Sequence, residues 1–385
     1  MLHRLPSLLL SYLWSSRMEH PVNKPKIIGY WFNEKKCQKF GVAELNAECK
    51  RRGIELVKID MSSPMEEQGP FDLLLHKLTA LFAQALNHDR KAITAIKMFE
   101  NYIGRHPETI VMDPLPGVYR LLLRNQTYNL LKQCFKHDDK VFTPTYVELS
   151  TTDLQHNRML IQEANVTFPV VCKPVTAGGG IEAHEMAVVF NESGISECTL
   201  PCVAQSFINH GAILYKLFVL GPVWFVIVRP SLKNFYAGVD GCFDINKLAV
   251  EQETVHFNSN NVSKADSQSP LTQLDPGDKK EDLPKADPAV FNRIVTNLRD
   301  ALNMDLLGID VVIDSCTGKY GIIDVNAFPS YDSVPNLMEH LVDLLVMRMN
   351  HSALSNNTSI SESKRTSIHI TSPDHPQEDS GVDTG

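Results

Sequence analysis

Short apolar runs alternate with amphipathic stretches in the first third of the chain. Residues 36–52, which end before Gly53, and residues 80–103 repeat apolar positions at helical spacing. The runs between them are rich in β-branched and large apolar residues, which is typical of buried strands: KIIGYWF (26–32), IELVKID (54–60), DLLLHKL (72–78) and TIVMDP (109–114). Strands that alternate with helices predict a parallel sheet covered on both faces. We therefore predict an N-terminal α/β domain over residues 26–115.

The pattern changes after residue 115. Residues 118–135 predict a helix, and residues 288–302 predict another. A glycine-rich run, TAGGGIEAHEM, separates two of the apolar runs that predict strands, which are VTFPVVCKPV (166–175), MAVVF (186–190), ILYKLFVLG (213–221) and VWFVIVRPS (223–231). Here strands follow one another closely, so we expect antiparallel pairing in this part of the chain.

Two carboxylates stand in the last apolar runs, LLGIDVVID and YGIIDVNAF. Residues 308–313 and 320–326 predict a hairpin, and if Asp314 opposes Tyr320, then Asp310 opposes Asp324. Asn326 would share their face, as would the apolar Val312 and Ile322, which implies burial. Like charges at opposed positions destabilise a sheet, so a bound hard cation such as Mg²⁺ is one explanation. A solvated outer face, or one carboxyl kept protonated, is the alternative.

The two ends of the chain differ in composition from the rest. Residues 1–25 contain an apolar stretch that is too short to span a bilayer. They predict either a targeting segment or, because Met18 offers an alternative start, an untranslated leader. Residues 346–385 are rich in Ser, Thr and Asn, most clearly after His351, and predict a disordered tail.

The overall composition narrows the class of protein. The chain has 385 residues, of which 43% are hydrophobic and 21% charged, as in soluble proteins of two or three domains. Its net charge of -8 argues against a nucleic-acid partner, and no apolar run suggests a membrane span. The eight cysteines show neither a CxxC pair nor zinc-ligand spacing, so we expect free thiols in the cytoplasm.

Basic residues occur singly or in pairs beside predicted loops and strand ends. Lys173 follows Val-Val-Cys on a predicted buried strand, and a buried lysine needs an anionic partner or a lowered pKa. The others could each be solvated surface residues, yet as a set they suit a small polyanion: Lys35, Lys36, Arg124, His184, Lys216, Arg229 and Lys233. The chain lacks the P-loop, the GxGxxG fingerprint and the protein-kinase signatures.

The order of these features resembles the ATP-grasp fold: a lysine-bearing strand, a glycine-rich lid, a QSFI connector, and a late Asp followed by D-x-N on the next strand. Within that superfamily the chain is similar to the inositol 1,3,4-trisphosphate 5/6-kinase family, also called the inositol-tetrakisphosphate 1-kinases. The strings that carry this resemblance lie between residues 26 and 345, and include GYWFNEKK, EEQGPFDLLLHKLT, HPETIVMDPLP, QSFINHGAILYKLFV, RPSLKNF, FNSNNVSK and GIIDVNAFP.

The resemblance implies an α/β protein with a parallel-sheet N-terminal domain and an ATP-grasp region over residues 116–345. That region would divide into a central lid-bearing part (116–204) and a mainly antiparallel C-terminal part (205–345). Mg²⁺, expected as two ions, would be bound by Asp310, Asp324 and Asn326. Substrate phosphates would be bound by Lys36, His184, Lys216, Asn326 and Ser330, the last of which replaces a glycine of the family pattern. ATP would be contacted by Arg124, Lys173, Gln205, Ser206, Phe207, Ile208, Asn209, Lys216, Ser231, Ser259 and Ser263.

The implied activity is ATP- and Mg²⁺-dependent phosphorylation of inositol 3,4,5,6-tetrakisphosphate at position 1, and of inositol 1,3,4-trisphosphate at position 5 or 6, by a monomer. Two alternatives use the same features. An ATP-grasp carboxylate–amine ligase would use the same nucleotide and metal residues, and a non-catalytic protein could bind inositol phosphates without turnover. The predicted substrate cations favour a polyphosphate over a lone carboxylate, and the predicted metal ligands favour catalysis.

Overall fold

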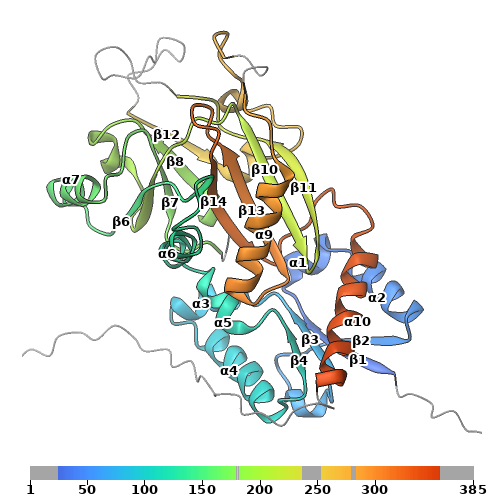
Figure 1. Cartoon of the computed structure of the whole chain (residues 1–385). Helices are drawn as coiled ribbons and strands as arrows, with labels where there is room; N and C mark the ends of the chain where they lie inside the picture. The colour runs from blue at the N-terminus through green and yellow to red at the C-terminus, as the bar shows by residue number, and fades with distance from the viewer. Residues whose placement is uncertain (1–24, 179, 181, 236–252, 279–282, 356–385) are drawn as a thin grey trace, which may run out of the picture.

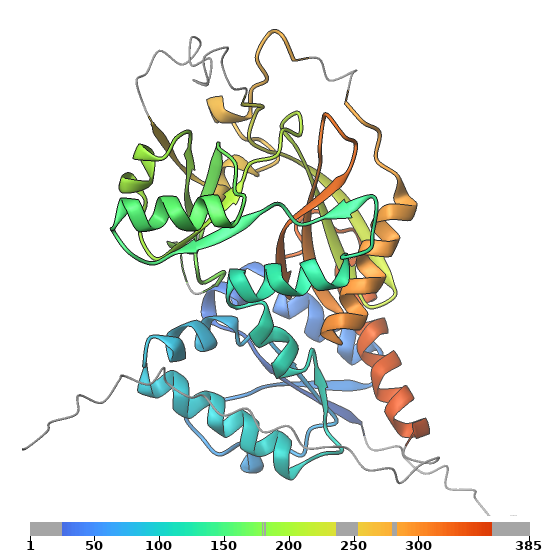
Figure 2. The same cartoon turned by 60° about the vertical axis from the view of Figure 1, so that its left-hand side comes forward.

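A computed structural model of the chain describes residues 25–178, 180, 182–235, 253–278 and 283–355. The predicted leader before residue 25, the tail after residue 355 and the lid residues Gly179 and Ile181 lie outside the described residues. The described chain forms three sheets, of which the N-terminal sheet lies below the other two in the views of Figures 1 and 2.

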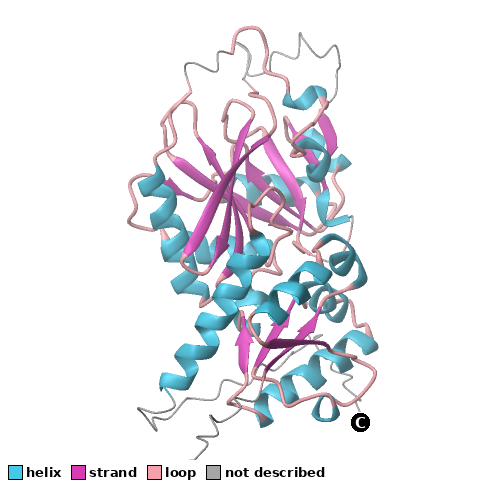
Figure 3. Ribbon diagram, turned by 90° about the vertical axis from the view of Figure 1, so that its right-hand side faces the viewer, coloured by secondary structure: helices cyan, strands magenta, loops and turns pink. Residues whose placement is uncertain are grey.

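The N-terminal sheet is parallel, as predicted, with strand order β2-β1-β3-β4. Its strands are β1 (Lys26–Trp31), β2 (Ile54–Lys58), β3 (Leu73–His76) and β4 (Ile110–Met112). Helices cover both faces (Figure 3) because alternate residues of the buried strands point to opposite sides. Leu74 packs with Phe82 and Phe99, whereas Leu73 and Leu75 belong to the core on the other face.

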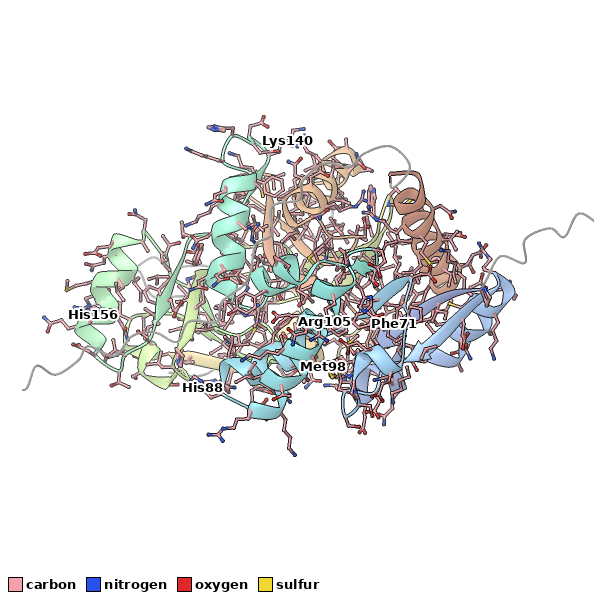
Figure 4. The ribbon with its side chains drawn as sticks, turned by 90° about the horizontal axis from the view of Figure 1, so that it is seen from below. Phe71, His88, Met98, Arg105, Lys140 and His156 are labelled. Carbon is pink, nitrogen blue, oxygen red and sulfur yellow. The ribbon has the colours of Figure 1, made fainter. Side chains whose placement is uncertain are left out.

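Each long helix predicted in the first 135 residues is divided in two. The stretch predicted as one helix over 36–52 forms α1 (Glu34–Lys39) and α2 (Val42–Arg51), separated at Gly41, whose φ of 70° suits glycine. The stretch 80–103 forms α3 (Thr79–Leu86) and α4 (Arg90–Arg105), and the Asp89 side chain caps α4. In Figure 4, Met98 and Arg105 mark α4 on the side of the molecule seen from below. The stretch 118–135 forms α5 (Leu115–Arg120) and α6 (Arg124–Cys134).

Helix α10 (Leu337–Ser355) corrects the prediction of a disordered tail from residue 346, because it continues to Ser355. It packs beside α2 on one face of the N-terminal sheet. Leu341 and Leu345 of α10 are fully buried there, in one core with Ile28 and Leu45. The N-terminal domain therefore includes a helix from the end of the described chain, in addition to the predicted residues 26–115.

The other two sheets are mainly antiparallel and form the rest of the molecule. One has the order β12-β8-β7-β9-β6, and the other has the order β11-β10-β13-β14-β5. The strands of the first sheet are β6 (Tyr146–Leu149), β7 (Val170–Pro174), β8 (Glu185–Val189), β9 (Cys202–Ser206) and β12 (Thr254–Asn258). The strands of the second are β5 (Val141–Phe142), β10 (Ile213–Leu220), β11 (Val223–Pro230), β13 (Leu306–Ile313) and β14 (Tyr320–Ala327).

These sheets exchange strands across the predicted division at residues 204 and 205. β12 comes from the C-terminal part of the chain but pairs with β8, and β5 comes from the central part but pairs with β14. Helices α7 (Leu154–Glu163) and α8 (Ser259–Val262) belong to the first sheet's side, whereas α9 (Pro288–Leu302), at the predicted position, packs with α6 beside the second sheet. Each of the two sheets therefore contains strands from both the central and the C-terminal part of the chain.

Candidate active site

One cavity lies between the two antiparallel sheets, and most of the predicted site residues line it. Strands β7, β9, β10, β13 and β14, the start of α6 and helix α8 contribute its walls. The predicted residues that line it are Arg124, Lys173, His184, Gln205, Ser206, Phe207, Ile208, Lys216, Ser231, Ser259, Ser263, Asp310, Asp324 and Asn326. The predicted residues Lys36, Asn209 and Ser330 do not line this cavity.

The β13–β14 hairpin places the carboxylates opposite each other, as predicted, but with a different register near its loop. Asp310 opposes Asp324, whereas Tyr320 opposes Ile313 instead of Asp314. The two observations fit together because the register shifts between Asp310 and Val311, where β14 contains the extra residue Ile323.

This β-bulge also corrects the predicted face of one apolar residue. Ile322 opposes Val311 and lies in the core, whereas Ile323 and Val312 line the cavity. The bulge directs the carbonyl of Ile323 to two donors, the Lys173 ammonium at 2.9 Å and the Tyr128 hydroxyl at 3.0 Å. Bulges commonly redirect side chains and carbonyls beside functional sites.

Each carboxylate is paired with a cation. Lys216 of β10 lies directly opposite Asp310 on β13, and its Nζ is 2.8 Å from both carboxylate oxygens. Arg124 Nη1 is 2.8 Å from Asp324 Oδ1, and the Arg124 side chain is only 2% exposed. Burial alone would raise the pKa of the Asp324 carboxyl, but the charges of Arg124, Lys173 and Lys216 outweigh it, so this pKa is lowered.

Local backbone contacts hold Arg124 in this position. Its backbone N–H donates to the carbonyl of Val175 at 2.9 Å, next to the glycine-rich run. Its side chain also donates to the carbonyls of Pro174 at 2.9 Å and Ala183 at 3.3 Å. The guanidinium therefore joins the start of α6, the glycine-rich run and strand β14.

Lys173 is buried in an unusual environment for an ammonium group. Its Nζ is within 2.7 Å of Gln205 Oε1 and 3.1 Å of the Tyr128 hydroxyl, and these partners are uncharged. Burial and the nearby charge of Arg124 lower the pKa of Lys173 to about 7, although Asp324 and Asp310 oppose this shift. A phosphate placed beside this amine would favour its charged form.

The opposite end of the cavity is apolar and has one unused donor. Val171, Met186, Phe207, Leu232, Phe257 and Val262 line it. Gln205 is 2% exposed, and because its Oε1 accepts from Lys173, its Nε2 is a donor that has no protein partner among the described residues. A flat heterocycle with a hydrogen-bond acceptor fits such surroundings.

His184, which follows the glycine-rich run, contacts helix α8. His184 Nδ1 is 3.3 Å from Ser259 Oγ, and burial together with the charge of Arg124 lowers the pKa of His184. The Ser263 hydroxyl donates to the carbonyl of Ser259 at 2.7 Å, and Asn260, which was not predicted, also lines the cavity. These groups offer hydroxyls, an amide and an imidazole along one wall.

A second group of cations lies just beyond Asn326. Lys36 Nζ donates to the carbonyl of Pro329 at 2.6 Å, and Lys77 Nζ donates to the carbonyls of Ala327 and Phe328 at 2.6 and 2.7 Å. Burial and the charge of Lys77 lower the pKa of Lys36 to about 6, while Asp332 acts in the opposite direction. Burial lowers the pKa of Lys77 to about 8. Sequence reasoning missed Lys77, although it lies in the quoted string DLLLHKLT.

Two of the predicted residues have side chains that are hydrogen-bonded to other parts of the protein. The side chain of Asn209 donates to the carbonyl of Phe235 at 3.0 Å and accepts from its N–H at 2.8 Å, so Asn209 joins two loops instead of facing the cavity. The Ser330 hydroxyl donates to Asp332 Oδ2 at 2.8 Å. Positive φ values occur at Phe328 (40°) and Tyr331 (59°), on either side of Ser330.

The chemistry of the donor set tests whether a hard cation fits. Asp310, Asp324 and Asn326 line one cavity, and the Asn326 amide donates to Asp324 Oδ2 at 3.3 Å. Carboxylate and amide oxygens suit Mg²⁺, which usually takes only one or two protein carboxylates and completes its shell with water and phosphate. The part of the chain that the structure describes has no cluster of three or more His, Cys, Asp or Glu side chains suited to a metal. The residues therefore fit an ion that enters together with phosphate oxygens.

Comparisons with known proteins identify the fold and the family of the chain. A family model described as the inositol 1,3,4-trisphosphate 5/6-kinase ATP-grasp domain matches residues 135–347, and the corresponding pre-ATP-grasp domain matches residues 27–118. A solved structure, of a D-cycloserine synthetase, superimposes with a TM-score of 0.52 at 15% identity, covering 84% of this chain and 99% of that one, which shows likeness of fold alone. The chain has the fold of an ATP-grasp protein.

Curated relatives specify the family within this class. Inositol-tetrakisphosphate 1-kinase of Xenopus laevis is 38% identical over 328 residues, which cover 84% of this chain and 80% of the relative. The protein of the same name from Danio rerio is 37% identical over 322 residues, which cover 83% of this chain and 78% of the relative. The chain belongs to the inositol 1,3,4-trisphosphate 5/6-kinase family, and the resemblance found in the sequence is confirmed.

Proposed function

We propose that the chain is an ATP- and Mg²⁺-dependent inositol polyphosphate kinase. It would phosphorylate inositol 3,4,5,6-tetrakisphosphate at position 1 and inositol 1,3,4-trisphosphate at position 5 or 6. The observation that carries the proposal is the succession of groups along one cavity: an apolar end, two basic side chains and a carboxylate pair, with further lysines beyond Asn326. Membership of the kinase family supports the same activity.

The nucleotide would lie with its base in the apolar end and its phosphates toward the carboxylates. The unused Nε2 donor of Gln205 suits an acceptor nitrogen of the base. Lys173 and Arg124 lie between this end and Asp324, so they would bind phosphate oxygens. The lowered pKa of Lys173 would return toward its ordinary value when phosphate binds.

Asp310, Asp324 and Asn326 would hold Mg²⁺, for which we propose two ions. Held by these residues, the metal would neutralise the charge that develops on the phosphates during phosphoryl transfer. Arg124 and Lys216 occupy these carboxylates in the present structure. On binding of the nucleotide, both side chains would exchange a carboxylate for a phosphate oxygen, which would leave the two carboxylates free to bind the metal.

The inositol phosphate would be held from the side of Lys36, Lys77 and His184. Lys36 and Lys77 lie close enough for one charge to lower the other's pKa, and neither forms an ion pair among the residues that the structure describes. Two neighbouring lysines without a carboxylate partner would both be charged beside an anion with several charges, and would favour its binding. The backbone N–H of Ser330 and the amide of Asn326 would add uncharged contacts.

No protein nucleophile is needed for this reaction. The residues would align an inositol hydroxyl with the γ-phosphate, and positioning with electrostatic stabilisation would supply most of the rate. We assign no general base.

The test measures phosphate transfer from γ-labelled ATP to each of the two inositol phosphates, with the product isomers separated by chromatography. Transfer to both is expected, and transfer to neither would refute the kinase proposal. Asp310→Asn should lower kcat by roughly 100-fold or more, because asparagine lacks the negative charge of the proposed metal ligand. Asp314→Asn, in the exposed loop of the same hairpin, is the matched control and should keep normal turnover.

The proposal extends to the setting of the enzyme. We propose a cytoplasmic monomer that takes ATP and inositol polyphosphates and has neither nucleic-acid nor membrane partners. The net charge of -8 supports the first exclusion. Within the described ranges, every helix is too short or too polar to cross a bilayer.

A further inference from the structure

His210 is a buried histidine beside the cavity whose tautomer is determined by its neighbours. Its Nδ1 is 2.5 Å from the carbonyl oxygen of Ile208, and its Nε2 is 2.7 Å from Ser231 Oγ. A carbonyl oxygen can only accept, so Nδ1 carries the hydrogen. Burial lowers the pKa of His210 to about 4, which keeps the ring neutral at pH 7. Nε2 is therefore a lone-pair acceptor.

The hydroxyl of Ser231 is consequently committed to the histidine. Because Nε2 can only accept, Ser231 must donate its single hydrogen to it. Ser231 is 8% exposed, and it lines the cavity. Any group that reaches its Oγ from the cavity therefore meets lone pairs alone. A hydroxyl or an amine can bind there, whereas a phosphate oxygen would be repelled.

The position of Ser231 along the cavity indicates which part of a nucleotide would meet it. The backbone N–H of Ser231 donates to the carbonyl of Ala212 at 2.9 Å. Ala212 directly precedes β10, and Lys216, the partner of Asp310, lies four residues after Ala212 on that strand. At about 3.3 Å per strand residue, Ala212 and Lys216 are roughly 13 Å apart. Ser231 thus lies away from the carboxylates, beside the apolar Leu232 and Phe207.

We propose that His210 is a positioning residue that turns Ser231 into an acceptor for a hydrogen-bond donor of the nucleoside, a ribose hydroxyl or the base amine. The pair would make the site select nucleotides that present a donor at this point. The inference rests on the proposed binding of ATP and adds a specificity determinant to it. His210 acts through Ser231 and need not contact the nucleotide.

Calorimetric titration with ATP and three analogues tests the inference, in the absence of inositol phosphate. The analogues are 2′-deoxy-ATP, 3′-deoxy-ATP and purine riboside triphosphate, each of which lacks one candidate donor. The wild-type protein should bind one of them about 3- to 10-fold more weakly than ATP, the effect of one hydrogen bond. That analogue identifies whether the donor is a ribose hydroxyl or the amine.

The decisive variants are Ser231→Ala and His210→Phe, with His156→Phe as the control on the exposed side of α7 (Figure 4). Ser231→Ala should bind ATP as weakly as the wild type binds the discriminating analogue, and its affinity for that analogue should be unchanged. His210→Phe should reduce the discrimination, because the Ser231 hydrogen is then no longer held away from the cavity. The double variant should be no weaker than Ser231→Ala. With turnover measured, KM for ATP should rise while kcat is unchanged, because the contact is remote from the transferred phosphate.

The possible outcomes separate this inference from the proposed function. Equal weakening for ATP and all three analogues would indicate a general packing defect and overturn the inference, as would a wild-type protein that does not discriminate among them. Absence of nucleotide binding would overturn both proposals. Absence of phosphate transfer, with the discrimination pattern intact, would overturn the kinase activity alone.

Discussion

Replacement of Asp324 by alanine should destabilise the protein far more than the same replacement at Asp310. Both carboxylates are proposed metal ligands, so both variants should lose turnover. Their partners differ in exposure: Arg124 is 2% exposed beside Asp324, whereas Lys216 is 23% exposed beside Asp310. Removal of Asp324 leaves a buried guanidinium without a counter-charge, and removal of Asp310 leaves an ammonium that can turn toward water.

The magnitude follows from this difference. Breaking a buried ion pair by removing one partner costs about 3–5 kcal/mol, and the lower end applies because Asp324 is 20% exposed and Arg124 keeps two carbonyl acceptors. We therefore expect about 3 kcal/mol for Asp324→Ala, against about 1 kcal/mol for Asp310→Ala. The larger loss corresponds to a decrease in Tm of roughly 5–10 °C.

Thermal unfolding in the absence of nucleotide and Mg²⁺ measures this difference without reference to turnover. Adding Arg124→Met to Asp324→Ala should recover at least part of the lost stability, because it removes the unpaired buried charge. Equal Tm values for Asp324→Ala and Asp310→Ala would refute the reasoning, since the two sites would then be equally solvated. Failure of the double variant to recover any stability would show that the loss arises from packing.

Three further predictions concern pH and the substrate side. Burial raises the pKa of Asp113 to about 7, so the contribution of this carboxyl to stability should fall as pH rises from about 4 to 7. Asp113→Asn should therefore flatten the dependence of Tm on pH between pH 5 and 8, and parallel profiles for variant and wild type would contradict this. Lys36, with a pKa near 6, should take up a proton when inositol phosphate binds at pH 7.5, giving a calorimetric heat that depends on the buffer and is lost in Lys36→Met. Ser330→Gly should change KM for inositol phosphate less than about twofold, because the hydroxyl is bonded to Asp332; a larger change would mean that this side chain contacts substrate.

Strand periodicity and a family resemblance agreed on the candidate residues, and the structure brings most of them to one cavity. The assumed pairing of Asp314 with Tyr320 placed Asp310 opposite Asp324, and the structure has the second pair only because the bulge at Ile323 offsets the one-residue error in the first. The bulge at Ile323 was missed because one extra apolar residue in a run that is already apolar does not visibly interrupt the alternation expected of a strand. The prediction that Ile322 faces the cavity failed for the same reason.

Other features depend on contacts between distant parts of the chain. Lys77 donates to carbonyls 250 and 251 positions later, and no local pattern indicates such a contact. Asn209 follows the connector whose neighbours line the cavity, yet its amide bonds to the backbone of Phe235. The end of α10 was missed because polar residues follow His351, whereas its apolar residues gain their role from packing on the N-terminal sheet.

Helix α10 also limits when the N-terminal domain can complete its folding during synthesis. Strands β1 to β4 emerge early in synthesis, but the sheet face that contains Ile28 and Leu75 is covered only in part, by α2, until Leu341 and Leu345 have been made. Nascent chains with uncovered apolar surface tend to aggregate, so the N-terminal domain should depend on chaperones until α10 has been made. The core of this domain is therefore completed only after most of the ATP-grasp region has been synthesised.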